Sequence, residues 1–162
     1  MNAEAQRISP APIRRSLRVK TSRQKAFDTF LAMGGWWMKS HSLVASGQKD
    51  VIIEPCVGGR WYEVANDGSE QEWGRVVACE APERLHLIWA LNADWTYDPD
   101  FETNVEVSFA EDGDHTIVTF EHRDLDRFGE RAEETRNGMD MGWGQLLTGY
   151  QAMAEAARTG TL

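Results

Sequence analysis

Apolar and polar residues alternate with a period of two through the middle of the chain, which is typical of half-buried β-strands. Val105, Val107 and Phe109 alternate with polar neighbours, and Leu85 and Leu87 do the same. Short segments rich in Gly, Pro, Asn and Asp separate these runs, which favours antiparallel pairing of consecutive strands. The pattern predicts strands over residues 13–19, 51–54, 60–65, 71–80, 84–91, 104–110 and 116–122.

Two segments have the period of an α-helix instead. Thr21 is expected to cap the first helix, because a glutamine three residues later completes a capping box ahead of an apolar face. This helix should end near Met33, since residues 34–35 are both glycine. Trp36 and Trp37 should then open a second short turn or helix.

A long amphipathic helix is predicted at the C-terminus. The residues of its apolar face are Met139, Trp143, Leu146, Leu147, Tyr150, Met153, Ala154 and Ala157. Gly142 and Gly149 lie beside this face, although glycine costs about 1 kcal/mol relative to alanine inside a helix. These glycines are expected to leave a void beside Trp143 and Tyr150, or else to permit close packing against the sheet or a loop.

The composition agrees with one ordinary globular domain. The chain has 162 residues, of which 41% are hydrophobic and 27% charged, and it contains no apolar run long enough to cross a bilayer. Residues 1–12 lack the apolar core of a secretory signal and are expected to form a flexible N-terminal arm of a cytoplasmic protein. A single domain should occupy residues 13–160, and its order of strands and helices places it in the α+β class.

Charge and metal-binding residues narrow the function classes. The net charge of −9 argues against nucleic-acid binding, because phosphate backbones are bound by clustered Lys and Arg. Cys56 and Cys79 are expected to be reduced and buried. The histidines do not have metal-site spacing, so neither a metal nor another cofactor is expected. They are His41, His86, His115 and His122.

Several short motifs occur in the order found in one superfamily. They are VGGRW at 57–61, EWGRV at 72–76, APERL at 81–85, EHR at 121–123 and GWG at the start of the last helix, 142–144. Together with the order strand, helix, short helix, meander and long helix, they resemble the START-like (SRPBCC) superfamily. In particular, the chain resembles bacterial proteins similar to the C-terminal domain of the activator of heat-shock-protein ATPase, over residues 13–158.

The resemblance implies a helix-grip fold. In this fold a curved antiparallel sheet, here of about seven strands, wraps around the long C-terminal helix, with one or two short helices after the first strand. The resemblance also implies a ligand cavity between sheet and helix. Members include lipid and hormone binders, aromatase/cyclases and heat-shock co-chaperones, so the fold alone assigns no function. The chain has no room for the separate N-terminal domain of the full activator, which makes a co-chaperone role less expected.

Candidate ligand-binding residues include tryptophans, of which the chain has seven, and polar residues near the implied cavity. Indole N–H groups lining such a cavity would suit a ligand that carries a carbonyl or hydroxyl group. An inward Arg60 beside Tyr62 could hold a carboxylate or phenolate, whereas an outward Arg60 would pair with Glu54 or Glu72. The candidates are Trp36, Trp37, Arg60, Tyr62, Trp73, Trp89, His122, Trp143 and Tyr150.

No catalytic residue is assigned from the sequence. His122 could act as an acid or base if it faces the cavity, and is otherwise structural or exposed. The loop 94–100, which contains Trp95 and Tyr97, is expected to form a solvated lid. A nucleophile elbow, a P-loop and a dinucleotide motif are all lacking, which favours a binding protein over an enzyme.

Three functions fit these observations. The leading hypothesis is an intracellular binding protein for a small hydrophobic or aromatic molecule. One alternative is a co-chaperone-like module that stimulates a heat-shock-protein ATPase in a stress response. Another is a cyclase, dehydratase or hydrolase that acts on polyketide-like substrates through Arg60, Glu72 and His122. A membrane partner is not expected, while a homodimer and a chaperone partner are left open.

Overall fold

A computed structural model of the chain describes residues 10–157. Most of the predicted N-terminal arm, residues 1–12, therefore lies outside the described residues, as do residues 158–160 of the predicted domain. Within residues 10–157, no helix combines the length and the apolar composition needed to cross a membrane.

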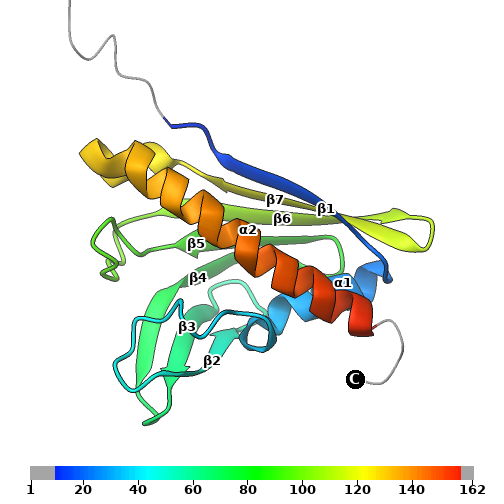
Figure 1. The fold of residues 1–162 in the computed structure, drawn as a ribbon, viewed down its shortest axis with the longest axis horizontal. Coiled ribbons are helices and arrows are strands. Elements are labelled where there is room, and N and C mark those ends of the chain that lie inside the picture. Colours follow the sequence, from blue (N-terminus) through cyan, green and yellow to red (C-terminus); the bar gives the residue numbers. More distant parts are fainter. Residues whose placement is uncertain (1–9, 158–162) are drawn as a thin grey trace, which may run out of the picture.

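Seven strands form one antiparallel sheet in the order β1-β7-β6-β5-β4-β3-β2. The strands are β1 (Ile13–Val19), β2 (Gln48–Ile53), β3 (Arg60–Ala65), β4 (Glu70–Glu80), β5 (Arg84–Trp89), β6 (Thr103–Asp112) and β7 (His115–Arg123). Strands β2 to β7 form a meander, and β1 closes the far edge by pairing with β7. The sheet crosses behind a single long helix, α2 (Figure 1). The predicted helix-grip arrangement is confirmed.

The first helix begins one residue later than predicted. Helix α1 (Arg23–Leu31) is capped by Ser22, whose hydroxyl accepts a hydrogen bond from the Lys25 N–H at 3.2 Å. Thr21 is buried instead, so its neighbour is the residue free to cap the helix. A short 3-10 turn, η2 (Met33–Gly35), follows, so the second turn precedes Trp36 and is not opened by it.

Helix α2 (Ala132–Ala157) begins well before the predicted start, after a 3-10 segment, η3 (Leu125–Arg131). The glycines of the GWG motif therefore lie inside the helix. Two glutamates in the first turn of α2 face the positive end of its dipole. The apolar face packs onto the sheet as predicted, with Trp143, Leu147 and Tyr150 buried.

Neither cysteine forms a disulfide. Cys56 is exposed and Cys79 half-buried, so the expectation that both are buried is wrong. Cys56 lies in the turn between β2 and β3, where the chain makes a tight bend over the two following glycines.

Candidate functional site

A cavity of about 440 Å³ lies between the sheet and α2. Its walls come from β4, the end of β5, the loop before β2, the loop after β5 and one side of α2. The lining residues are Trp37, Ser40, His41, Ser42, Leu43, Trp73, Trp89, Leu91, Trp95, Gly138, Met139, Gly142, Trp143 and Leu146. The lining is predominantly apolar, which is typical of small-molecule sites.

Strand β4 reaches the cavity through the Trp73-Gly74 pair. A Cβ added at Gly74 would lie 1.8 Å from the carbonyl oxygen of Ile88, so only glycine allows β5 to approach this closely. The side chain of Trp73 lies beside Trp89 of β5, with ring centroids 6.4 Å apart. The glycine of the EWGRV motif therefore brings two cavity tryptophans together.

The indole N–H groups of the four buried tryptophans in the wall all donate to acceptors within the protein. The pairs are Trp37 with the His41 carbonyl (2.8 Å), Trp73 with the Glu63 carboxylate (3.2 Å), Trp89 with the Leu91 carbonyl (3.1 Å) and Trp143 with His122 Nδ1 (3.2 Å). The expectation that these N–H groups would suit a polar ligand is therefore not met. They fix the orientation of the rings, and the wall presents aromatic surface to the cavity.

A buried carboxylate, Glu63, organises the loop at one side of the cavity. This fully buried side chain accepts hydrogen bonds from the Ser42 hydroxyl (2.8 Å) and the Leu43 N–H (2.7 Å). It also accepts from Gln48 (3.0 Å) and from Trp73. Four donors thus satisfy the carboxylate, and no basic side chain of residues 10–157 forms an ion pair with it.

His122 lies behind the aromatic wall and is completely buried. Its Nδ1 accepts from Trp143, and its Nε2 lies 2.8 Å from the Thr103 hydroxyl, which in turn donates to the Trp89 carbonyl. This chain of hydrogen bonds requires a neutral ring with its proton on Nε2. Burial lowers the pKa of His122 to about 3. His122 therefore positions two cavity tryptophans and is not part of the lining.

Trp37, Trp73, Trp89 and Trp143 are the sequence-predicted site residues that line the cavity. Trp36 and Tyr150 lie in the adjoining core, with ring centroids 5.5 Å apart. The Tyr150 hydroxyl donates to the Ala26 carbonyl at 2.7 Å, and burial raises the pKa of this hydroxyl.

Arg60 and Tyr62 are not brought to the cavity. They lie on the outer face of β3, where the Arg60 guanidinium stacks over the Tyr62 ring at 3.8 Å and pairs with Glu70 and Glu72. The opposite set of β3 residues, including Trp61 and Glu63, points inward. The inward alternative for Arg60, on which its role as a ligand-binding residue depends, is therefore wrong. The outward alternative, with Arg60 paired to Glu72, is the one observed. This placement also separates Arg60 and Glu72 from His122.

The predicted lid loop reaches the cavity through Trp95, whose side chain is half exposed and packs edge-on against Trp89. Trp95 has a left-handed backbone, with φ of 60°. The Asn92 side chain supports this turn by accepting from the N–H groups of Asp94 (2.9 Å) and Thr96 (3.1 Å). An ion pair joins Asp94 to Arg131 and ties the loop to the segment before α2.

The two helix glycines have different environments. Gly142 lines the cavity, and a Cβ added there would lie 3.7 Å from His41 Nε2. Gly149 lies elsewhere, and its added Cβ would be 3.3 Å from the backbone oxygen of Trp36. The expectation of ligand space is thus supported at Gly142, whereas Gly149 serves close packing.

Sequence reasoning missed most of the loop before β2. His41 and Leu43 line the cavity, but they lie in an irregular segment without a hydrophobic period. Leu91, Met139 and Leu146 also line the cavity, although their sequence pattern predicts only ordinary strand or core positions. The sequence feature that lies nearest to this loop and could have indicated its place at the cavity is the Trp36-Trp37 pair just before it.

Comparison with known proteins places the chain in a family. The family model described as Activator of Hsp90 ATPase homolog 1-like protein matches residues 22–155. No curated protein is significantly similar to the chain.

Solved structures with a similar fold include two that share about a third of their residues with this chain. CalC, a self-sacrificing resistance protein from Micromonospora echinospora, is 34% identical, with a TM-score of 0.69 over 91% of this chain and 96% of CalC. The anthrahydroquino-gamma-pyrone synthase Txn09 is 32% identical, with a TM-score of 0.64 over 89% of this chain and 97% of the synthase.

A third structure, protein MLL2253 from Mesorhizobium loti, has a TM-score of 0.67 at 18% identity, over 90% of this chain and 98% of its own, and so supports the fold alone. The helix-grip architecture, the cavity between sheet and helix and the family match agree with one another. The chain belongs to the Activator of Hsp90 ATPase homolog 1-like family, within the START-like superfamily.

Proposed function

We propose that this protein binds a small planar aromatic molecule in the cavity between the sheet and α2. The observation that carries the proposal is the wall of four tryptophans whose N–H groups are already used inside the protein. Such a wall offers ring faces and edges, which attract other aromatic rings through stacking and edge-to-face contacts. The cavity of about 440 Å³ falls within the range of small-molecule sites.

The similarity to the synthase Txn09, at 32% identity, supports an aromatic, polyketide-like ligand class. The free Cys56 and Cys79 suit a reducing compartment, so we place the protein in the cytoplasm.

Anthraquinone is a suitable first probe, because it is planar, apolar and quenches tryptophan fluorescence. Titration should show saturable quenching in the micromolar range. Gly142→Leu should fill the cavity and weaken binding at least tenfold. Ala152→Leu is the matched control, because it adds the same side chain to an exposed position of the same helix. Equal affinity of both variants, or no saturable binding by the unmodified protein, would contradict the proposal.

A second candidate is a cyclisation reaction on a polyketide-like substrate, and the similarity to a synthase favours it. The constellation of Arg60, Glu72 and His122 does not support this candidate, since the first two pair on the outer face and the third is sealed in the core. Mass spectrometry of a poly-β-ketone substrate mimic incubated with the protein tests the idea. A product lighter by one water, formed only with protein, would support catalysis. An unchanged mass would contradict catalysis, and ligand binding would remain as the proposed function.

A further inference from the structure

Within residues 10–157, the cavity lining contains a single ionisable side chain, His41. The other polar groups on side chains of the lining are the hydroxyls of Ser40 and Ser42 and the indole N–H groups, of which that of the half-exposed Trp95 can only donate. Ser42 is already used, because its hydroxyl donates to Glu63 at 2.8 Å and accepts from the Val44 N–H at 3.2 Å. The Ser40 hydroxyl lies 3.1 Å from His41 Nδ1. The second nitrogen of His41, Nε2, is therefore the principal side-chain acceptor left to meet a ligand.

The Nε2 atom lies over a gap in the side chains of α2. An added Cβ at Gly142 would be 3.7 Å from Nε2 and 3.9 Å from Cδ2 of the same ring. Among the described residues, no protein group is hydrogen-bonded to Nε2. The glycine thus leaves the imidazole edge open to the cavity, where any larger side chain would cover it.

The main chain around His41 is fixed on both sides. The His41 N–H donates to the Met38 carbonyl at 2.9 Å, and the His41 carbonyl accepts from Trp37 Nε1 at 2.8 Å. The next two residues, Ser42 and Leu43, are held by the buried carboxylate of β3. The backbone that carries the imidazole is therefore in place before a ligand arrives, which reduces the entropy lost on binding.

We propose that His41 is the polar anchor of the cavity and that its Nε2 accepts a hydrogen bond from a phenolic hydroxyl, which makes hydroxylated aromatics the ligand class of this site. This inference rests on the proposed binding function. A neutral imidazole that donates from Nδ1 to Ser40 Oγ leaves Nε2 as an acceptor. A phenol supplies the O–H donor on a planar ring that the indoles can contact.

The charge of the lining disfavours carboxylated aromatics. Within residues 10–157, no Lys or Arg lines this cavity, so a carboxylate inside it would face one imidazole only. Burial of a poorly compensated charge is strongly unfavourable. A phenol needs only one hydrogen-bond acceptor, which His41 provides. An ether or a bare quinone has no O–H to donate and would leave Nε2 unpaired.

Three probes of the same ring system test the inference: 2-hydroxyanthraquinone, 2-methoxyanthraquinone and anthraquinone. The unmodified protein should bind the hydroxylated probe about tenfold more tightly than the other two, as expected for one added hydrogen bond. In His41→Phe this preference should vanish, so that the three probes bind with similar affinity. His41→Gln, which retains an acceptor oxygen, should keep part of the preference.

The outcomes separate this inference from the proposed function. Equal affinity of the unmodified protein for all three probes overturns the role of His41 and leaves aromatic binding intact. Retention of the full preference in His41→Phe also overturns it. Failure of all three probes to bind overturns both proposals. His86→Phe is the matched control, because this histidine lies on the outer face of the sheet and should not change any affinity. The comparison of probes on the unmodified protein remains decisive if a variant does not fold.

Discussion

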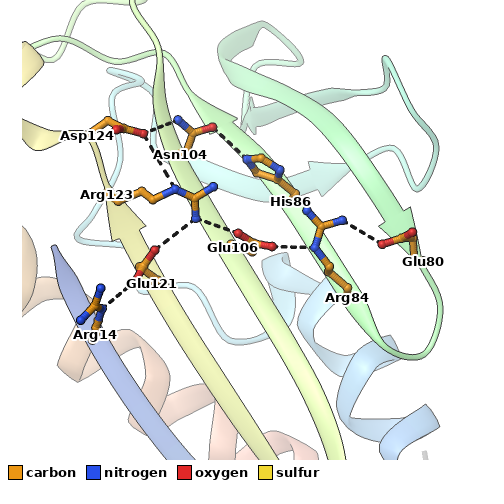
Figure 2. Close-up of polar contacts among 9 residues, drawn as sticks. All are labelled: Arg14, Glu80, Arg84, His86, Asn104, Glu106, Glu121, Arg123 and Asp124. Atoms are coloured by element: carbon orange, nitrogen blue, oxygen red, sulfur yellow. Dashed lines mark hydrogen bonds and ion pairs between the residues drawn. The ribbon is translucent and has the colours of Figure 1, made fainter.

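The two faces of the sheet use the same strands but handle polar groups in opposite ways. On the inner face, His122 and Glu63 are fully buried among tryptophans and have hydrogen-bond partners at fixed positions. On the outer face, charged side chains of β1, β5, β6 and β7 form a connected ladder (Figure 2). Glu121 and His122 are adjacent in the chain, yet one belongs to each face.

The outer ladder consists of shared ion pairs. Arg123 pairs with both Glu106 (2.7 Å) and Glu121 (3.2 Å), and Glu121 also pairs with Arg14 (2.7 Å). Arg84 extends the ladder from Glu106 at 2.6 Å (Figure 2). Hydrogen bonds from Arg84 and Arg123 hold the pKa of Glu106 below its usual value.

The comparison teaches that the contribution of a polar side chain to stability depends less on how many partners it has than on whether water can replace them. An outer ion pair that is lost can be replaced by solvent, so each contributes little. A buried polar group cannot be rescued in this way, and removal of one partner leaves the other unsatisfied. The inner polar groups should therefore dominate stability although they are far fewer.

The largest effect is expected from Glu63→Gln. The amide keeps one acceptor oxygen but turns an N–H₂ group toward donors, so we expect a loss of about 3 kcal/mol in the free energy of unfolding. Urea denaturation measures this loss. Glu106→Gln is the outer-face counterpart and should lose less than about 1 kcal/mol. Similar losses in the two variants would remove the distinction between the faces.

Acidification should destabilise the protein through His122. Its pKa is about 3 in the folded state and about 6.5 in the unfolded state, so between these values only the unfolded chain binds the proton. Stability therefore falls as the pH drops below 6.5, by about 2 kcal/mol at pH 5. Denaturation curves at pH 7 and pH 5 measure the change.

The matched variants for this pH dependence are His122→Gln and His86→Gln. The first should lose most of the slope between pH 7 and pH 5, and the second, on the outer face, should keep it. The carboxylates whose pKa values are lowered change the stability mainly below pH 5, so they contribute little to the slope between pH 7 and pH 5. A slope that survives in His122→Gln would show that another group titrates.

A smaller effect should separate the two helix glycines. Gly142→Ala gains helix propensity with only an ordinary contact to His41, so we expect about 0.5 to 1 kcal/mol of added stability. Gly149→Ala brings its Cβ to 3.3 Å from the Trp36 backbone oxygen, which should cancel this gain. Thermal denaturation should therefore rank Gly142→Ala above Gly149→Ala, and the reverse order would contradict the packing role of Gly149.

The smallest effect is expected at the edge of the outer ladder. Arg14 is 71% exposed in its side chain, so Arg14→Gln should change the free energy of unfolding by no more than about 0.5 kcal/mol. High salt should abolish the difference, because it screens exposed charges. Urea denaturation at low and high sodium chloride checks both statements. A loss that persists in high salt would mean that Arg14 contributes packing as well as charge.

The sequence predicted the meander of consecutive strands and the apolar face of α2, because the first follows from alternation and short connections and the second from the helical period. The bounds of β3 were also predicted, but not which of its residues point into the core. Each of the two alternating sets of residues in β3 contains both apolar and polar side chains, and the charge of Glu63 suggests an outward position. Only the four donors around this carboxylate make its inward position stable, and these come from separate segments.

The cavity histidine was hidden for a related reason. His122, the histidine that the sequence offers as an acid or base, points inward, but Trp89 and Trp143 lie between it and the cavity. His41 lies in a loop without any period, and its position depends on hydrogen bonds to Trp37 and on the loop's attachment to Glu63. Local pattern cannot reveal a position that is set by contacts across the fold.

The contacts among the tryptophans should also couple the fluorescence of all the indoles in the protein. All seven indoles are linked by ring contacts, with centroid separations between 4.8 and 6.4 Å. At such separations, absorbed light energy passes between rings faster than it is emitted. A quenching molecule beside any one indole therefore quenches the emission of all seven. The tryptophan fluorescence of this protein should thus fall almost completely when the cavity is occupied.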